Sequence, residues 1–117
     1  PLACAVAEQV MTLLTKKTLL NGVKKKEKIF LKELESINDD YQCFSAIRSS
    51  GLWIGCKLNV TENFNLDTVM KACYEKGLMI LKANDNTIRL APSLIIEDDL
   101  ILKGLKILRV VIQEQHP

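Results

Sequence analysis

The chain has 117 residues, 48% of them hydrophobic and 26% charged, with a formal net charge of +2. This composition excludes the disordered and fibrous classes, and the length suits one compact domain over residues 1–117. The small net charge gives no indication of binding to nucleic acid or to a membrane surface. No apolar run approaches the ~18 residues that cross a membrane, so we expect a cytoplasmic protein.

Two helices followed by two strands are predicted in the N-terminal half. Apolar residues recur at helical spacing from Pro1 to about Thr15, and a second helix is expected from Thr18 or Leu19 to about Asn38. Strands are expected at Phe44–Ile47 and Leu52–Leu58, with residues 49–51 as the turn between them.

The C-terminal half is predicted to contain a helix, two strands and a final helix. Asn65 is suited to cap the third helix, and Gly77 is suited to end it. Strands are expected at Leu78–Lys82 and Thr87–Leu90, and the acidic residues 97–99 begin the last helix. This order (α-α-β-β-α-β-β-α) predicts an α+β fold: a small, mostly antiparallel sheet with helices packed on one face.

Cysteine and histidine usage argues against a self-contained hydrolase or metalloenzyme. Cys4, Cys43, Cys56 and Cys73 lack the close spacing of a zinc or redox motif. Free, mostly buried thiols in a reducing compartment are favoured over disulfides. Because the only histidine, His116, is next to last, we expect no Cys–His nucleophile and no histidine metal site in this chain.

The densest positive charge lies in Lys24–Lys28, and aromatic residues do not interleave with it. A solvated helix face is therefore favoured over a phosphate-binding stripe. The scattered aromatic residues, Trp53 among them, are expected to be core or half-buried side chains and not a stacking platform.

Arginine is scarce, since three of the 16 basic residues are arginines. Surface charge is sufficient to explain Arg109, and either an ion pair or a functional role fits Arg48. Arg89 interrupts an apolar strand that Pro92 ends. A guanidinium on a rigid strand is well placed to bind an anion, although an ion pair on the surface fits this pattern equally well.

Several segments, taken in order, resemble one enzyme family. Pro1–Ala7 resembles the start of its small-domain helix, and Phe44–Arg48 with Gly51–Gly55 resembles its central strand signature. Glu75–Gly77 followed by Ile88–Leu94 is similar to its closing motif. Over nearly the whole chain the sequence resembles the C-terminal small domain of the class-III pyridoxal-phosphate-dependent aminotransferases, most of all the bacterial acetylornithine (succinyl-diaminopimelate) aminotransferases.

The resemblance implies amino-group transfer between N-acetylornithine and 2-oxoglutarate, in arginine biosynthesis, by a homodimeric parent enzyme. Arg89 matches the arginine that grips the carboxylate of the small amino acid substrate. The lysine that binds pyridoxal phosphate belongs to a large domain that this chain lacks. We therefore expect no catalytic residue and no cofactor on this chain, and no activity from it alone. Ser49 and Ser50 stand where the family has a glycine, so the geometry of that turn is expected to differ.

A chain that begins at Pro1 and not at Met is expected to be an excised or truncated piece, whose missing partner is the large domain. The alternative is a non-catalytic interaction or oligomerisation domain. High hydrophobicity in a short chain favours that alternative slightly, because it leaves an exposed apolar patch.

Overall fold

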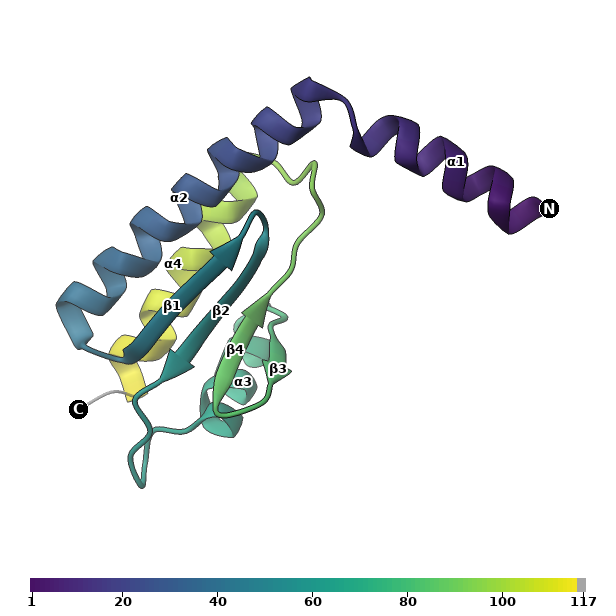
Figure 1. The fold of residues 1–117 in the computed structure, drawn as a ribbon. Helices are drawn as coiled ribbons and strands as arrows, with labels where there is room; N and C mark the ends of the chain where they lie inside the picture. The colour runs from purple at the N-terminus through teal and green to yellow at the C-terminus, as the bar shows by residue number, and fades with distance from the viewer. Residues whose placement is uncertain (116–117) are drawn as a thin grey trace.

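The computed structural model describes residues 1–115, so His116 lies outside the described residues (Figure 1). Eight elements follow in the predicted order. They are α1 (Leu2–Leu14), α2 (Lys17–Tyr41), β1 (Phe44–Ser50), β2 (Trp53–Leu58), α3 (Leu66–Glu75), β3 (Leu81–Ala83), β4 (Thr87–Leu90) and α4 (Asp98–Gln115).

The strands form one sheet in the order β1-β2-β4-β3, and every neighbouring pair is antiparallel. Helices α2, α3 and α4 lie on one side of this sheet, and Figure 1 views it from the opposite side, which no helix within residues 1–115 covers. The predicted α+β fold is confirmed. Alternation along the strands therefore divides the side chains between a buried inner face and an open outer face.

The core lies between the inner face of the sheet and the helices. On the central strands the buried side chains alternate with outward-facing ones, as the strand period of two requires. Each of α2, α3 and α4 places an apolar stripe in this core. The stripe residues are Phe30, Leu34 and Ile37 on α2, Leu66, Val69 and Cys73 on α3, and Ile101, Leu105, Leu108, Val111 and Ile112 on α4.

Two strand boundaries differ from the prediction by three residues, and the start of β2 and the end of β3 differ by one. Strand β1 runs to Ser50, because the turn is made by Gly51, which has a φ of 61°. Strand β3 begins at Leu81 and not at Leu78, because Leu78 still belongs to the end of α3. Its amide donates to the carbonyl of Cys73 at 2.8 Å while Gly77 donates to Tyr74 at 3.0 Å, a Schellman motif with Gly77 at a φ of 82°.

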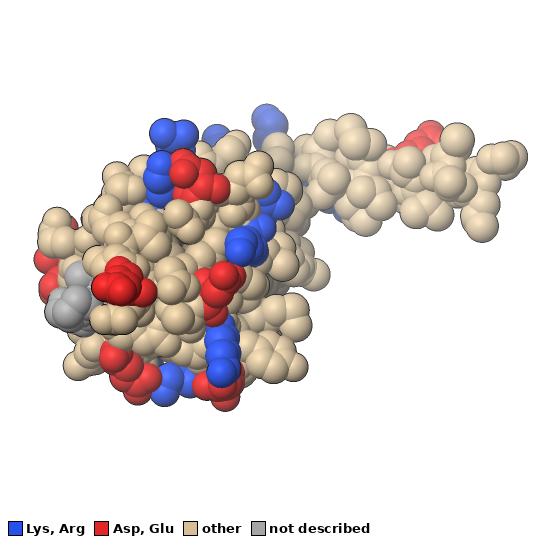
Figure 2. Space-filling view, turned by 90° about the horizontal axis from the view of Figure 1, so that it is seen from below, with Lys and Arg blue, Asp and Glu red and all other residues tan. Residues whose placement is uncertain are grey.

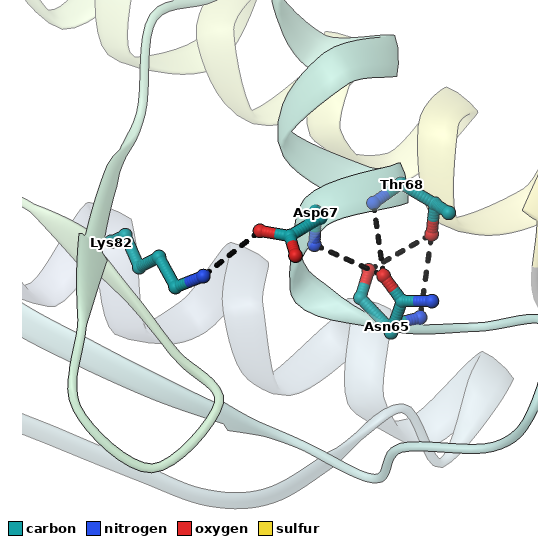
Figure 3. A network of polar contacts seen from close by, with 4 residues as sticks. All are labelled: Asn65, Asp67, Thr68 and Lys82. Atoms are coloured by element: carbon teal, nitrogen blue, oxygen red, sulfur yellow. Dashed lines mark hydrogen bonds and ion pairs between the residues drawn. The ribbon is translucent and has the colours of Figure 1, made fainter.

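The start of α3 is held by the polar network of Figure 3. Asn65 Oδ1 accepts hydrogen bonds from the amides of Asp67 and Thr68, both at 3.1 Å, and Thr68 Oγ1 accepts from the amide of Asn65 at 3.3 Å. This reciprocal pair is a capping box with threonine in place of the usual acidic residue. Lys82 Nζ contacts Asp67 at 2.9 Å, so the same turn also binds β3 to α3.

Helix α1 is formed as predicted, but the rest of the described chain leaves its apolar stripe uncovered. It projects from the body, and Figure 2 shows an arm with a single acidic patch. None of its residues is buried, and Leu2, Val6 and Val10 are among the large exposed hydrophobic side chains. Among the helices of residues 1–115, none has the length and apolar character needed to cross a membrane.

All four cysteines are free, as predicted. Cys4 on α1 is exposed, whereas Cys43, Cys56 and Cys73 are buried. Burial raises the pKa of Cys43 and Cys73 from the ordinary 9.0 to about 11, and that of Cys56 to about 12. The folded chain therefore favours the protonated thiols, and the stability that this contributes below pH 9 is lost as the pH rises through about 11.

Replacing the helix cap should destabilise the fold without changing it. Asn65→Ala removes the acceptor of two amides and should lower the free energy of unfolding by about 1 kcal/mol, measured by urea denaturation. Asn84→Ala is the matched control, because Asn84 lies exposed in the β3–β4 turn and should change stability by less than about 0.5 kcal/mol. Equal effects of the two changes would contradict the cap.

Thiol labelling should separate the exposed cysteine from the buried ones. At pH 8 a chromogenic disulfide reagent should react rapidly with Cys4 alone in the native chain, because the thiolate is the reacting form and burial raises the pKa of the other three. All four should react once the chain is denatured in guanidinium. Rapid reaction of a second thiol under native conditions would contradict the burial.

Candidate functional site

The outer face of the sheet carries the candidate site. Alternation directs Trp53, Gly55 and Lys57 of β2 to this face, together with Thr87 and Arg89 of β4. Their strand neighbours Ile54, Cys56, Ile88 and Leu90 fill the core. Because the buried neighbours fix the register, the outward side chains are held on a rigid support.

Two arginines flank a glycine in one row across the sheet. Arg48 of β1 pairs with Gly55 of β2, and Gly55 pairs in turn with Arg89 of β4. A Cβ at Gly55 would lie 3.3 Å from Thr87 Cγ2, so this position has little room for a side chain. The row therefore has a cation on each side and no side chain between them.

Arg89 stacks on Trp53. Its Cζ lies 5.1 Å from the ring centroid, within the range of a cation–π contact. Among residues 1–115 no ion pair engages Arg89, so its N–H groups can donate to a ligand. An edge-on pair of parallel hydrogen bonds is the way in which arginine binds a carboxylate, so the contact orients Arg89 for an anion.

The prediction that Trp53 is a core or half-buried residue is wrong. Its side chain is 61% exposed, because it falls on the outward positions of β2. Tyr74 is exposed as well, whereas Phe30, Phe44 and Phe64 are buried and bear out the prediction. The number of aromatic residues could not show that Trp53 faces outward. The alternation of apolar and other residues in Leu52–Leu58 could have shown it, because Trp53 falls on the outward positions of that strand.

An open groove of about 320 Å³ follows this row, and Arg48, Trp53, Gly55 and Arg89 line it. Arg89 also lines a second hollow of about 310 Å³ on its other side. The walls of that hollow are almost entirely apolar, with contributions from Leu81, Pro92, Ile96, Leu100 and Leu105 among others. Arg89 thus stands between a cationic groove and an apolar hollow.

Five basic side chains in the described part of the chain have carboxylate partners, and the two arginines of the groove are not among them. Within residues 1–115, Lys57 pairs with Asp85 and Arg109 pairs with Asp40, with Ser36 Oγ 2.7 Å from the second Arg109 nitrogen. No ion pair involves Arg48 or Arg89 in the same part of the chain. The groove therefore offers two uncompensated positive charges.

The lysine-rich face of α2 is solvated, as predicted. Lys24, Lys25 and Lys28 are exposed, and Lys26 is half-buried with its Nζ 3.9 Å from Asp98. In the described part of the chain no charged side chain is buried, and no group of three histidine, cysteine or acidic residues is placed to hold a metal ion. These residues do not fit pyridoxal phosphate, which needs a desolvated lysine.

Comparison with known proteins gives consistent matches. The family described as aminotransferase class-III matches residues 1–112. The chain is 42% identical over 106 residues to the acetylornithine/succinyldiaminopimelate aminotransferase of Buchnera aphidicola, covering 91% of this chain and 26% of that protein. It is 41% identical over 114 residues to a succinylornithine transaminase of Yersinia pseudotuberculosis, covering 97% of this chain and 28% of that one.

The fold is similar to solved structures as well. The crystal structure of the N-acetylornithine aminotransferase from Stenotrophomonas maltophilia superposes with a TM-score of 0.84 at 30% identity, covering 97% of this chain and 31% of that one. An acetylornithine aminotransferase from Elizabethkingia anophelis gives 0.85 at 30% identity, with 97% of this chain and 29% of that one covered. The chain thus spans between a quarter and a third of these relatives.

Removing the stacking partner should loosen Arg89 while the fold is retained. Trp53→Leu deletes a cation–π contact of about 0.5–1 kcal/mol, so the heteronuclear NOE of the Arg89 Nε–Hε resonance should fall. Because Trp53 is exposed, the free energy of unfolding should change by less than about 0.5 kcal/mol. Trp53→Phe keeps an aromatic face and serves as the control. An unchanged NOE in Trp53→Leu would contradict the role of the ring.

Proposed function

The chain belongs to the class-III aminotransferase family, and from that premise we propose that it is the substrate-gripping small domain of an acetylornithine-type aminotransferase. Arg89 carries the proposal, as an oriented guanidinium without a carboxylate partner in the described chain. The reaction is the transfer of an amino group from N-acetylornithine to 2-oxoglutarate. Both compounds have a carboxylate on the carbon that exchanges the amino group.

Arg89 binds that carboxylate through two parallel hydrogen bonds. Such a bidentate contact fixes the plane of the carboxylate and with it the direction of the neighbouring carbon, which a lysine cannot do as a point charge. Correct orientation of the reacting carbon is a large part of the rate advantage of an enzyme. One arginine serves both half-reactions, because the donor and acceptor present the same group.

The cofactor is bound outside this chain. Class-III aminotransferases use pyridoxal phosphate, which stabilises negative charge on the reacting carbon when bound. Since none of the described residues is a buried lysine, we place the lysine that holds the cofactor in the remaining length of the enzyme. The chain alone then binds substrate weakly and does not turn over.

The partner of this domain is the large domain of the same enzyme. Its relatives are more than three times as long, since the match covers 91% of this chain and 26% of the Buchnera protein. The uncovered apolar stripe of α1, with Leu2, Val6 and Val10, supports a surface that another part of the protein covers. A homodimeric, cytoplasmic parent enzyme completes the proposal, and three buried free thiols agree with a reducing compartment.

A non-catalytic interaction domain is the second candidate, and the exposed stripe of α1 favours it equally. This candidate gives no reason for a stacked, unpaired arginine beside a glycine that keeps the groove open. The groove therefore supports the aminotransferase domain over the interaction domain.

The experiment uses the enzyme from the complete reading frame that contains this segment. Arg89→Lys should raise KM for N-acetylornithine and for 2-oxoglutarate by roughly ten- to a hundredfold, because a charge-assisted pair of hydrogen bonds is lost. The cofactor absorbance should not change. Arg109→Lys is the matched control, since it makes the same substitution at an arginine that already pairs with Asp40.

Two results would overturn the proposal. Unchanged KM values in Arg89→Lys would remove the carboxylate role of the arginine. A stoichiometric lysine imine, with turnover, when the 117-residue chain alone is mixed with pyridoxal phosphate would show that the cofactor site lies in this chain after all.

A further inference from the structure

We infer that Glu27 of α2 is a positioning residue for Arg89, and that it acts through the tip of the β1–β2 hairpin and through Trp53. The inference rests on the proposed function of Arg89. It adds to that function a residue on the helix side of the sheet, which does not line the groove. Three contacts carry it: Glu27 with the hairpin, the hairpin with Trp53, and Trp53 with Arg89.

The carboxylate of Glu27 binds the hairpin at two points. Its Oε1 accepts hydrogen bonds from Ser49 Oγ at 2.7 Å and from the Gly51 amide at 3.0 Å. Ser49 pairs with the buried Ile54, so its side chain points to the helix side of the sheet. Because the acceptor is a carboxylate, both bonds are of the stronger, charge-assisted kind. They tie the hairpin to α2 across 22 and 24 positions of the sequence.

No cation competes for this carboxylate within residues 1–115. Glu27 is half-buried and makes no ion pair there. Of the two lysines next to it in the sequence, Lys26 has its Nζ 3.9 Å from Asp98, and Lys28 is exposed. A carboxylate that is partly removed from water needs hydrogen-bond donors to compensate for the lost hydration. The hairpin supplies these donors, so Glu27 serves as an acceptor for the hairpin and not as half of an ion pair.

The tip of the hairpin also packs directly on α2. The turn consists of Gly51 and Leu52, and a positive φ at the first of them alone is typical of a type II′ turn. Val23 precedes Glu27 by one helical turn and therefore lies on the same face of α2. A Cβ at Gly51 would lie 3.0 Å from Val23 Cγ1. One face of α2 thus holds the turn by close packing and by two hydrogen bonds.

Trp53 takes its position from this turn. It is the first residue of β2 and pairs with Ser50 at the end of the hairpin. Its side chain is 61% exposed, so core packing does little to hold the ring. The ring is the surface on which Arg89 stacks, with Cζ 5.1 Å from the centroid. A displacement of the hairpin tip therefore moves the support of the guanidinium, and Glu27 limits that displacement.

The test measures KM in the enzyme from the complete reading frame. Glu27→Ala should raise KM for N-acetylornithine and for 2-oxoglutarate by about two- to fivefold, the range that corresponds to the loss of one exposed cation–π contact. The direction of the change is informative. Removal of a negative charge would by electrostatics alone favour anionic substrates and lower KM, so a rise in KM reports on positioning and not on charge.

Matched variants isolate the two hydrogen bonds. Glu27→Gln removes the same charge but keeps Oε1, the atom that accepts both bonds, so KM should return to the native value or fall below it. Ser49→Ala removes one of the two bonds and should give a smaller rise. It carries the test if Glu27→Ala does not fold. Glu35→Ala is the control, because it makes the same substitution at an exposed position of α2 and should leave KM unchanged. Unchanged cofactor absorbance verifies that each variant is folded.

A double variant tests the route through the ring. If Glu27 acts through Trp53, then Glu27→Ala combined with Trp53→Leu should raise KM no further than Trp53→Leu does alone, because the ring on which Arg89 stacks is already absent. Two independent contributions would instead multiply.

The failures of the two proposals are distinguishable. Unchanged KM values in both Glu27→Ala and Ser49→Ala, an equal rise in Glu27→Gln or Glu35→Ala, or multiplied effects in the double variant each overturn the role of Glu27. None of these results touches the carboxylate role of Arg89, which the Arg89→Lys enzyme tests separately. Unchanged KM values in Arg89→Lys overturn the proposed function and the inference together.

Discussion

The pairing of β2 with β4 is the constraint on which the rest of the structure depends. Ile54 opposite Leu90 and Cys56 opposite Ile88 are buried on the inner face. Since a slip of one residue would exchange the two faces of a strand, these buried pairs fix the register. The same register sets Gly55 opposite Arg89 on the outer face. The groove is therefore a consequence of how the core packs.

The two surfaces that this chain leaves uncovered differ in chemistry. Helix α1 has an apolar stripe and a single charged residue, Glu8, so it suits contact with another protein surface. The outer sheet face has a stacked arginine, a second arginine and a small residue between them, which suits a charged small molecule. The chain matches about a quarter of the length of its relatives, so it is expected to have one surface that contacts the rest of the protein and one that binds a ligand.

Local sequence patterns predicted most of the secondary structure. Helix stripes, the Asn65 cap, Gly77 at the end of α3 and the alternation of β2 each depend on neighbours close in sequence, and each was predictable. The start of β3 was not. Residues 78–80 were expected in the strand, but they form the end of the Schellman turn and the connection to the sheet. Backbone hydrogen bonds to α3 compete there with pairing to β4.

The sequence by itself determined the order of elements, the inward stripes and the singular position of Arg89, because these follow from periodicity and residue scarcity. Only the tertiary structure decided what surrounds Arg89. Arg48 and Trp53 lie 41 and 36 positions before it in the chain, and Trp53 was wrongly expected to be a core or half-buried side chain. Which side chains meet across strands depends on register and on which face the helices cover, and both arise from packing between distant segments.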